Sequence, residues 1–260
     1  MVFAMNTDMA KATDIRRLPE GCSTPVVLIR HAQSQWNQEN RFTGWANPKL
    51  TKAGLAEAVE AGRFLHINGY RFDVAYSSRL QRAITTLDIL LEQIGQPDIS
   101  RQQDWRLNER HYGALQGMDK DEAIRQAGEY QVWRWRRGYE DRAMPLLRTD
   151  SAHPVNDTRY KDVNPQQLPG VENLAQTRAR VVLFWNEQII PRIQQGERVL
   201  ISAHGNTLRA LIMELAGMSV EEVEAFEIPT ATPILYRFDH NAQPLDWRYL
   251  KNHVDEAMSA

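Results

Sequence analysis

Two histidines each follow a short apolar run that has the length of a buried strand. Arg30 and His31 come directly after Val26 to Ile29, and His204 comes shortly after Val199 to Ile201. In open α/β sheets, ligands bind at the carboxyl ends of the strands. Asn37 and Asn206 lie a few residues after the two histidines. We therefore expect one site that both halves of the chain build.

The residue types favour transfer of a phosphoryl group through a phosphohistidine. Neutral imidazole is a good nucleophile toward phosphorus, and guanidinium groups match phosphate oxygens in pairs. His31 is the candidate nucleophile, with Arg30, Arg82 and a protonated His204 as donors to the charged oxygens. Successive strand residues point to opposite faces, so Arg30 and His31 reach one ligand only if the chain turns at the strand end.

Two further segments carry candidate functional side chains. Between Trp105 and Lys120, Glu109 could exchange the proton of an alcohol beside Tyr112, although composition alone fits a surface charge cluster about as well. In the segment 133–139, Arg136 and Arg137 could clamp a phosphate or carboxylate. Its alternating aromatic and basic residues also suggest stacking on nucleic-acid bases, which the near-neutral charge of the chain argues against. Trp133 and Trp135 in the same segment are expected to pack in the core.

Strand and helix patterns alternate along the chain and predict an α/β fold. Thr51 is expected to cap a helix with Leu55, Val59, Phe64 and Leu65 on its buried face. Ser77 and Ser78 are expected to cap the next helix after a strand, with Arg79 and Arg82 in its first turns. The remaining predicted elements are a strand at 72–76, a long helix at 172–195 bent or ended by Pro191, a helix after His204, a short helix capped by Ser219 and Glu222, and edge strands at 234–238 and 247–250.

The middle of the chain differs from its two ends. Four prolines, Pro145, Pro154, Pro165 and Pro169, fall between residues 144 and 170. They argue for a loop, and so long a loop is usually a lid or a binding segment.

Size and composition bound the class of protein. We expect residues 1–23 to be a disordered leader and residues 24–260 a single domain. The only cysteine, Cys22, excludes internal disulfides and thiolate metal clusters and favours a cytoplasmic location. With 31 basic and 33 acidic residues the net charge is −2, which predicts binding to neither nucleic acid nor an anionic membrane. No apolar stretch is long enough for a transmembrane helix.

Four motifs together resemble the cofactor-dependent phosphoglycerate mutases of the histidine phosphatase superfamily. They are LIRHAQSQWNQENRFTGW at 28–45, LNERHYGALQG at 107–117, WRRG at 135–138 and AHGNTLRAL at 203–211. The resemblance spans most of residues 25–250 in order. It implies a three-layer fold with a mainly parallel central sheet flanked by helices, and a helical and loop insertion over the active site.

The resemblance also implies roles for individual residues. His31 would carry the phosphoryl group, primed by 2,3-bisphosphoglycerate, while Glu109 exchanges the proton and His204 stabilises the transition state. The reaction would interconvert 3-phosphoglycerate and 2-phosphoglycerate in glycolysis and gluconeogenesis, without a metal, in a homodimer or homotetramer. Contacts to phosphate and carboxylate would come from Arg30, Asn37, Thr43, Gly44, Arg82, Tyr112, Lys120, Arg136, Arg137, Gly205 and Asn206.

Four features depart from the family pattern. Ala32 stands where glycine is usual, which would cost about 1 kcal/mol or more if the backbone there has positive φ. Gln33 replaces a common glutamate, and Asn173 replaces a serine near the expected site. Ten residues follow Leu250, fewer than in many mutases, and a less closed site would admit water. Two alternatives therefore stay open, a phosphatase of a small phosphorylated metabolite on the same fold and a catalytically weak relative that binds phosphorylated ligands.

Overall fold

A six-stranded sheet forms the centre of the computed structural model, which describes residues 23–250. The expected leader falls almost entirely outside the described residues, as does the C-terminal tail after Leu250. The order across the sheet is β3-β2-β4-β1-β5-β6. Strands β1 to β4 are parallel to one another, whereas β5 and β6 are antiparallel to their neighbours. The strands are β1 Thr24–Arg30, β2 Val74–Ser77, β3 Ser100–Gln103, β4 Val199–Ala203, β5 Pro233–Phe238 and β6 Pro244–Tyr249.

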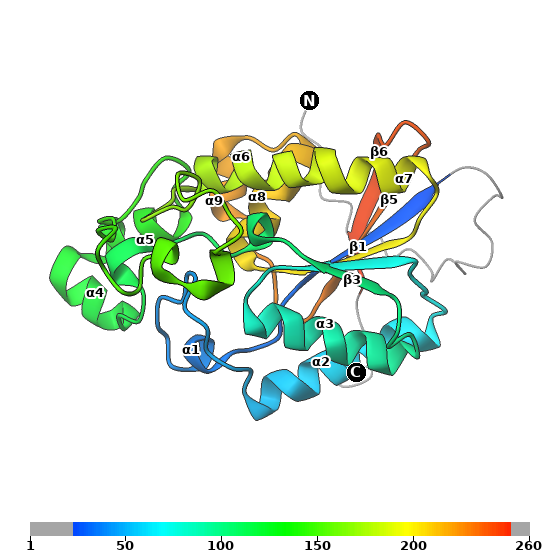
Figure 1. Ribbon diagram of the computed structural model, residues 1–260, viewed down its shortest axis with the longest axis horizontal. Helices are drawn as coiled ribbons and strands as arrows, with labels where there is room; N and C mark the ends of the chain where they lie inside the picture. The colour runs from blue at the N-terminus through cyan, green and yellow to red at the C-terminus, as the bar shows by residue number, and fades with distance from the viewer. Residues whose placement is uncertain (1–22, 251–260) are drawn as a thin grey trace, which may run out of the picture.

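Helices cover both faces of the sheet, so the fold is the expected three-layer α/β architecture (Figure 1). In β1, Val26 and Leu28 pack toward α6 and α8, while Val27 and Ile29 pack toward α2 and α3. Both faces of β1 are apolar because the strand is buried on both sides. The helices are α1 Gln35–Gln38, α2 Lys52–Ile67, α3 Gln81–Ile94, α4 Lys120–Ala127, α5 Glu129–Arg137, α6 Leu174–Phe184, α7 Ile190–Gln194, α8 Gly205–Ala216 and α9 Val220–Ala225.

The packing of α2 differs from the prediction. Thr51 caps this helix as expected, but Leu55 is 41% exposed and the buried face consists mainly of small residues. A Cβ atom on Gly62 would come 2.7 Å from the Cβ of Gln93 on α3. Close approach of the two helices therefore requires small side chains, and a count of large apolar residues misplaces the contact face.

Three other element predictions also need correction. Ser77 and Ser78 do not cap α3, which begins at Gln81 with Leu80 at the N-cap position and no side-chain cap. The strand at 233–238 is not an edge strand, since β5 pairs with both β1 and β6. The polar strand β3, Ser100–Gln103, was not predicted because its sequence lacks an apolar pattern.

The predicted long helix is divided into three parts. It begins at Leu174 with Asn173 as the N-cap, and a π-helical turn at Trp185–Ile189 separates α6 from α7. Pro191 lies in the first turn of α7, directly after that turn. Because proline has no N–H to donate to the carbonyl four residues earlier, the hydrogen-bond pattern changes there while the helical path continues.

The segment between β3 and α6 lies beyond the carboxyl ends of the parallel strands. It holds α4, α5 and the proline-containing loop at 144–170, at the left of Figure 1. Only short 3-10 turns interrupt this loop, at Pro154–Asn156 and Thr158–Tyr160. Tyr160, Val163 and Leu168 are buried against Trp45 and Leu80, so the loop packs both on the segment that follows His31 and on the start of α3.

Candidate active site

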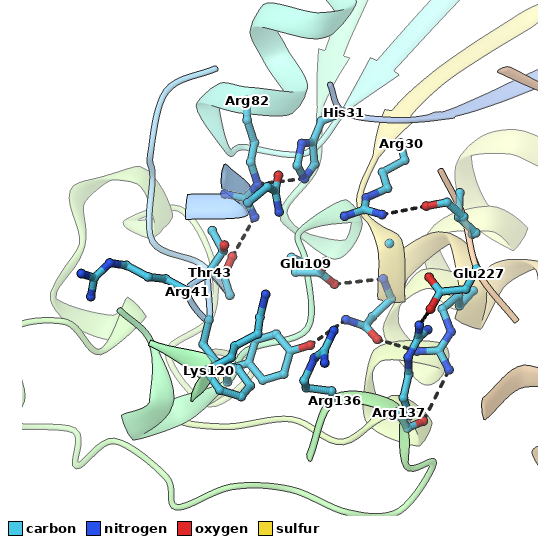
Figure 2. Close-up of a pocket in the computed structure, with 18 residues that line it drawn as sticks. Arg30, His31, Arg41, Thr43, Arg82, Glu109, Lys120, Arg136, Arg137 and Glu227 are labelled. Carbon is cyan, nitrogen blue, oxygen red and sulfur yellow. Dashed lines mark hydrogen bonds and ion pairs between the residues drawn. The ribbon is translucent and has the colours of Figure 1, made fainter. Parts of the chain in front are cut away.

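A cavity of about 170 Å³ opens at the carboxyl ends of β1 and β4, between the sheet and the α4–α5 insertion (Figure 2). Every site residue predicted from the sequence lines it except His204, which is fully buried. The lining contains seven cationic side chains and two carboxylates. The pocket therefore suits a ligand with several negative charges. The residues that line it are Arg30, His31, Asn37, Arg41, Phe42, Thr43, Gly44, Arg82, Glu109, Tyr112, Lys120, Arg136, Arg137, Gly205, Asn206, Arg209, Glu227 and Ile228.

His31 has the hydrogen bonds of a neutral imidazole with a defined tautomer. Its Nδ1 lies 2.7 Å from the carbonyl oxygen of Ala32, and Arg82 Nε donates to its Nε2 over 3.1 Å. A carbonyl only accepts, so Nδ1 carries the proton and Nε2 presents its lone pair. Burial, with Arg82 and Arg30 nearby, holds the pKa of His31 well below its usual value. Nε2 thus needs no deprotonation at neutral pH to act as a nucleophile, and its lone pair accepts the Arg82 N–H in the free protein.

Arg30 and Arg82 supply positive charge beside that nitrogen. Arg82 lies in the first turn of α3, completely buried, and donates to the carbonyl oxygens of Ala46 and Gly44, each over 2.8 Å. Burial lowers the pKa of Arg82 to about 10, so it stays charged at neutral pH. Arg30 donates to the Ile228 carbonyl over 2.7 Å. Both Arg30 and His31 line the pocket because β1 ends at Arg30 and the chain leaves the pleat there.

His204 immediately precedes α8, and its ring centroid lies 4.9 Å from that of His31. Its Nε2 is 2.7 Å from Ser78 Oγ, while its buried Nδ1 has no partner among the described residues. Burial, together with Arg82 and His31, holds the pKa of His204 well below its usual value. The expected protonated His204 is therefore corrected to a neutral ring in the free protein. An incoming anion would favour its protonation.

Glu109 lies near the middle of the pocket (Figure 2), and its carboxylate accepts two backbone N–H groups. Oε1 accepts from Asn206 N over 3.2 Å and from Arg110 N over 2.8 Å. The Glu109 carbonyl accepts from Arg180 over 3.0 Å, and Arg180 forms a buried ion pair with Glu172 at 2.6 Å. The buried pair thus holds the backbone of Glu109 in place. Sequence reasoning missed this support, since it joins segments about 70 residues apart.

A second group of cations lies across the pocket from His31, Arg30 and Arg82, with Glu109 between the two groups (Figure 2). Arg136 and Arg137 belong to the last turn of α5, and Lys120 is the first residue of α4. Burial and the neighbouring Arg136 lower the pKa of Lys120 to about 8. Arg137 pairs with Glu227 at the pocket rim. The pocket therefore has two cationic ends.

Five lining residues were not predicted from the sequence: Arg41, Phe42, Arg209, Glu227 and Ile228. The first two lie inside the motif at 28–45, and Arg209 lies inside AHGNTLRAL, so the motifs held a signal for them. Glu227 and Ile228 lie in no motif, and only the fold brings them to the pocket.

Several other residues singled out from the sequence lie outside the pocket. Arg79 pairs with Asp162 through two hydrogen bonds of 2.6 and 2.7 Å. Gln33 accepts from Thr51 Oγ1 over 2.8 Å, and Asn173 caps α6 at the surface, so neither departure from the family pattern touches the site. Trp133 is 41% exposed, contrary to the expected core position, whereas Trp135 packs partly buried.

Ala32 carries no backbone strain. Within the described chain, positive φ at residues other than glycine occurs at Asn40, Ala231 and Ala242 only. Ala32 is fully buried beside Leu50 and Ala58, and its N–H donates to Thr86 Oγ1 over 3.1 Å. The strain considered for the case of positive φ is thus absent.

Replacing Ala32 by glycine is expected to lower the free energy of unfolding by about 1 kcal/mol, because a buried methyl group is lost and the unfolded chain gains freedom. Turnover is expected to stay within about twofold, since Ala32 packs against Leu50 and Ala58 and none of the three lines the pocket. Denaturant unfolding and steady-state kinetics check the two effects. A tenfold gain in turnover would show instead that the methyl group obstructs catalysis.

Histidines buried in the neutral form should make stability fall in acid. His111 is fully buried, and burial lowers its pKa to about 3 from 6.5. Below pH 6.5 His111 binds a proton in the unfolded chain, whereas in the folded chain it binds one only near pH 3. Each pH unit in this window therefore removes about 1.4 kcal/mol per such group.

We expect His111→Asn, whose Oδ1 can still accept from Gly113 N, to reduce the slope of unfolding free energy against pH between 6 and 4. Urea unfolding at several pH values measures it. The slopes of variant and wild type should coincide above pH 7.5, where His111 is neutral in both states, and equal slopes below pH 6 would refute the assignment.

Comparison with known sequences identifies the superfamily of this chain. The sequence profile of the histidine phosphatase superfamily (branch 1) matches residues 26–156 and 148–248, which together make up most of the chain. The chain belongs to this superfamily. The segment outside the match at the N-terminus includes the expected leader.

Solved structures share the fold at low sequence identity. A mycobacterial glucosyl-3-phosphoglycerate phosphatase is 22% identical, with 87% of this chain and 97% of that chain covered and a TM-score of 0.62. The α-ribazole phosphatase from Shigella flexneri is 20% identical, covering 88% and 96%, with a TM-score of 0.61. A phosphoglycerate mutase from Bacillus anthracis is 18% identical, covering 89% and 93%, with a TM-score of 0.63. Phosphatases and a mutase thus share this architecture.

Two further observations concern the described residues alone. Between residues 23 and 250, no helix combines the length and apolar composition needed to cross a bilayer. In the same range, no three or more His, Cys, Asp or Glu side chains are grouped so that they could hold a metal ion.

Proposed function

We propose that this superfamily member is a phosphoglycerate mutase, an isomerase that interconverts 3-phosphoglycerate and 2-phosphoglycerate. The observation that carries the proposal is the pair of cationic ends on either side of Glu109. A phosphorylated acid has a phosphate for the end at His31 and a carboxylate for the end at Lys120, Arg136 and Arg137. Removal of a phosphate alone needs only the first end.

The residues of the pocket account for the chemistry of the transfer. In the loaded enzyme the free hydroxyl of 3-phosphoglycerate attacks the phosphorus on His31 Nε2, so an O–P bond forms as the N–P bond breaks. His31 Nε2 then attacks the other phosphate of the bisphosphorylated intermediate, so an N–P bond forms as that P–O bond breaks, and Arg30 and Arg82 balance charge on the phosphoryl oxygens in both steps. The Glu109 carboxylate takes the proton of the attacking hydroxyl in the first transfer and returns it to the departing alkoxide in the second. His204, which becomes protonated as the anion arrives, donates to the transferring group.

The same residues fit 2,3-bisphosphoglycerate as primer. It carries three anionic groups, and Arg30 and Arg82 would hold one end while Lys120, Arg136 and Arg137 hold the other. When bound, it supplies the phosphoryl group that first loads His31.

A phosphatase acting on a small phosphorylated metabolite is the second candidate. Two of the three similar structures described above are phosphatases. His31, Glu109 and His204 serve this reaction equally well, with water taking the place of the second hydroxyl.

One assay separates the two candidates. Purified protein is incubated with 3-phosphoglycerate, with and without 2,3-bisphosphoglycerate, while 2-phosphoglycerate and inorganic phosphate are measured in the same samples. The mutase predicts primer-dependent formation of 2-phosphoglycerate that exceeds phosphate release by at least about 100-fold, or roughly 2.7 kcal/mol in barrier. Dominant release of phosphate would support the phosphatase, and binding without either product would support a catalytically weak relative.

A further inference from the structure

The buried guanidinium of Arg209 on α8 bonds both to the pocket residue Asn206 and to the backbone of Val223. Arg209 is 2% exposed, and each of its hydrogen bonds goes to a neutral oxygen. Its Nη1 donates to Asn206 Oδ1 over 2.8 Å and its Nε to the Val223 carbonyl over 3.1 Å, with a second contact from Nη2 to the same carbonyl. Burial, with Arg110 and Arg137 nearby, lowers the pKa of Arg209 to about 9, so it is still charged at neutral pH.

These contacts settle the direction of the Asn206 amide. Guanidinium can only donate, so the atom facing Arg209 must be the amide oxygen. The amide nitrogen then faces Tyr112, and Asn206 Nδ2 donates to the Tyr112 hydroxyl oxygen over 3.1 Å. Without Arg209, either end of the amide could face Tyr112.

The Tyr112 hydroxyl accepts a second hydrogen bond, from Arg110. Arg110 Nη2 donates to it over 3.3 Å, and the same buried guanidinium also binds the carbonyls of Arg136 and Gly138 at the end of α5. Both partners can only donate, so the phenol oxygen accepts two hydrogen bonds. The hydroxyl hydrogen of Tyr112 can therefore bond to neither of these two groups. Tyr112 lines the pocket, so that hydrogen is available to a ligand oxygen.

We infer that Arg209 is a positioning residue that fixes the Asn206 amide and, through it, makes the Tyr112 hydroxyl a hydrogen-bond donor to the bound anion. The hydrogen-bond network Arg209–Asn206–Tyr112 leaves the Tyr112 hydroxyl able to donate to the pocket. A negatively charged ligand group can accept this hydrogen bond, whereas a donor group cannot. The inference uses the substrate of the proposed function as one probe, but it concerns binding and not the fate of the phosphoryl group.

A double-mutant cycle tests the hydrogen-bond network Arg209–Asn206–Tyr112. Binding of 3-phosphoglycerate and, in parallel, of inorganic tripolyphosphate is measured by calorimetry for wild type, Tyr112→Phe, Arg209→Lys and the double variant. Lysine keeps the charge but cannot hold both Asn206 Oδ1 and the Val223 carbonyl as the guanidinium fork does. Each single variant is expected to weaken binding about tenfold or more, as loss of a hydrogen bond to a charged group does. The double variant should lie within about threefold of either single one.

Three outcomes would overturn the inference. Wild-type affinity in Arg209→Lys would mean that only the charge of Arg209 matters. Wild-type affinity in Tyr112→Phe, or a double variant whose loss of affinity is the product of the two single losses, would show that the residues do not act through one another. If Arg209→Lys fails to show a cooperative thermal transition, Asn206→Leu removes the same hydrogen-bond network. This variant is then paired with Tyr112→Phe under the same criteria. Coupling seen with tripolyphosphate when 3-phosphoglycerate does not bind would support the hydrogen-bond network while counting against the proposed function.

Discussion

Replacing His31 by alanine is expected to abolish the phosphoenzyme and to lower turnover by at least about 10³-fold, because no other group could take over as nucleophile at that position. The His31 tautomer presents Nε2 to the pocket, with Arg82 3.1 Å away and Arg30 lining the same wall. Loss of the imidazole removes the atom to which phosphorus bonds. Acid-labile, base-stable incorporation of labelled phosphate from 2,3-bisphosphoglycerate, measured beside steady-state turnover, checks both effects.

A matched control for this variant is His240→Ala, which removes an exposed histidine outside the pocket. It should label and turn over as the wild type does. Labelling of His31→Ala at the wild-type level would place the phosphoryl group on another residue and would sink the proposed mechanism. A thermal melt of each variant separates a chemical defect from a folding defect.

Glu109→Gln is expected to lower turnover of phosphoglycerate by about 10²- to 10⁴-fold with little change in substrate affinity. Glutamine keeps an oxygen that can accept from Asn206 N and Arg110 N, the two contacts of the native carboxylate. The variant therefore preserves the geometry and removes the proton that the alkoxide must gain or lose. Steady-state kinetics give kcat and KM separately.

The leaving group supplies an internal control for Glu109. With p-nitrophenyl phosphate the departing phenolate is stable without a proton, so first-turnover release of p-nitrophenolate should fall much less, by about tenfold or below. Equal losses with both substrates would assign Glu109 a binding or structural role instead of proton transfer. Glu222→Gln, a change in the capping box of α9 outside the pocket, serves as the matched control.

The main elements around the site could be predicted because their signals are local. The apolar runs before His31 and His204 are buried strands, and Gly95 ends α3 in the left-handed conformation, as its position after the apolar helix pattern indicates. Errors arose where tertiary packing overrides local preference. The buried face of α2 is lined by glycine and alanine because α3 approaches closely, and β3 is polar because it forms an edge of the sheet.

By itself, the sequence determined the family and the chemical types at the site, since His31, Glu109, His204 and most of the cationic residues lie in short motifs whose order along the chain is enough to recognise them. Only the tertiary structure decided the protonation and direction of those groups. The neutral state of His204, the backbone support from Glu172 and Arg180, and the orientation of Asn206 by Arg209 all depend on burial and on contacts between buried groups. Such properties come from the dielectric and the hydrogen-bond partners around a side chain, many of them distant in sequence, and no local pattern encodes those.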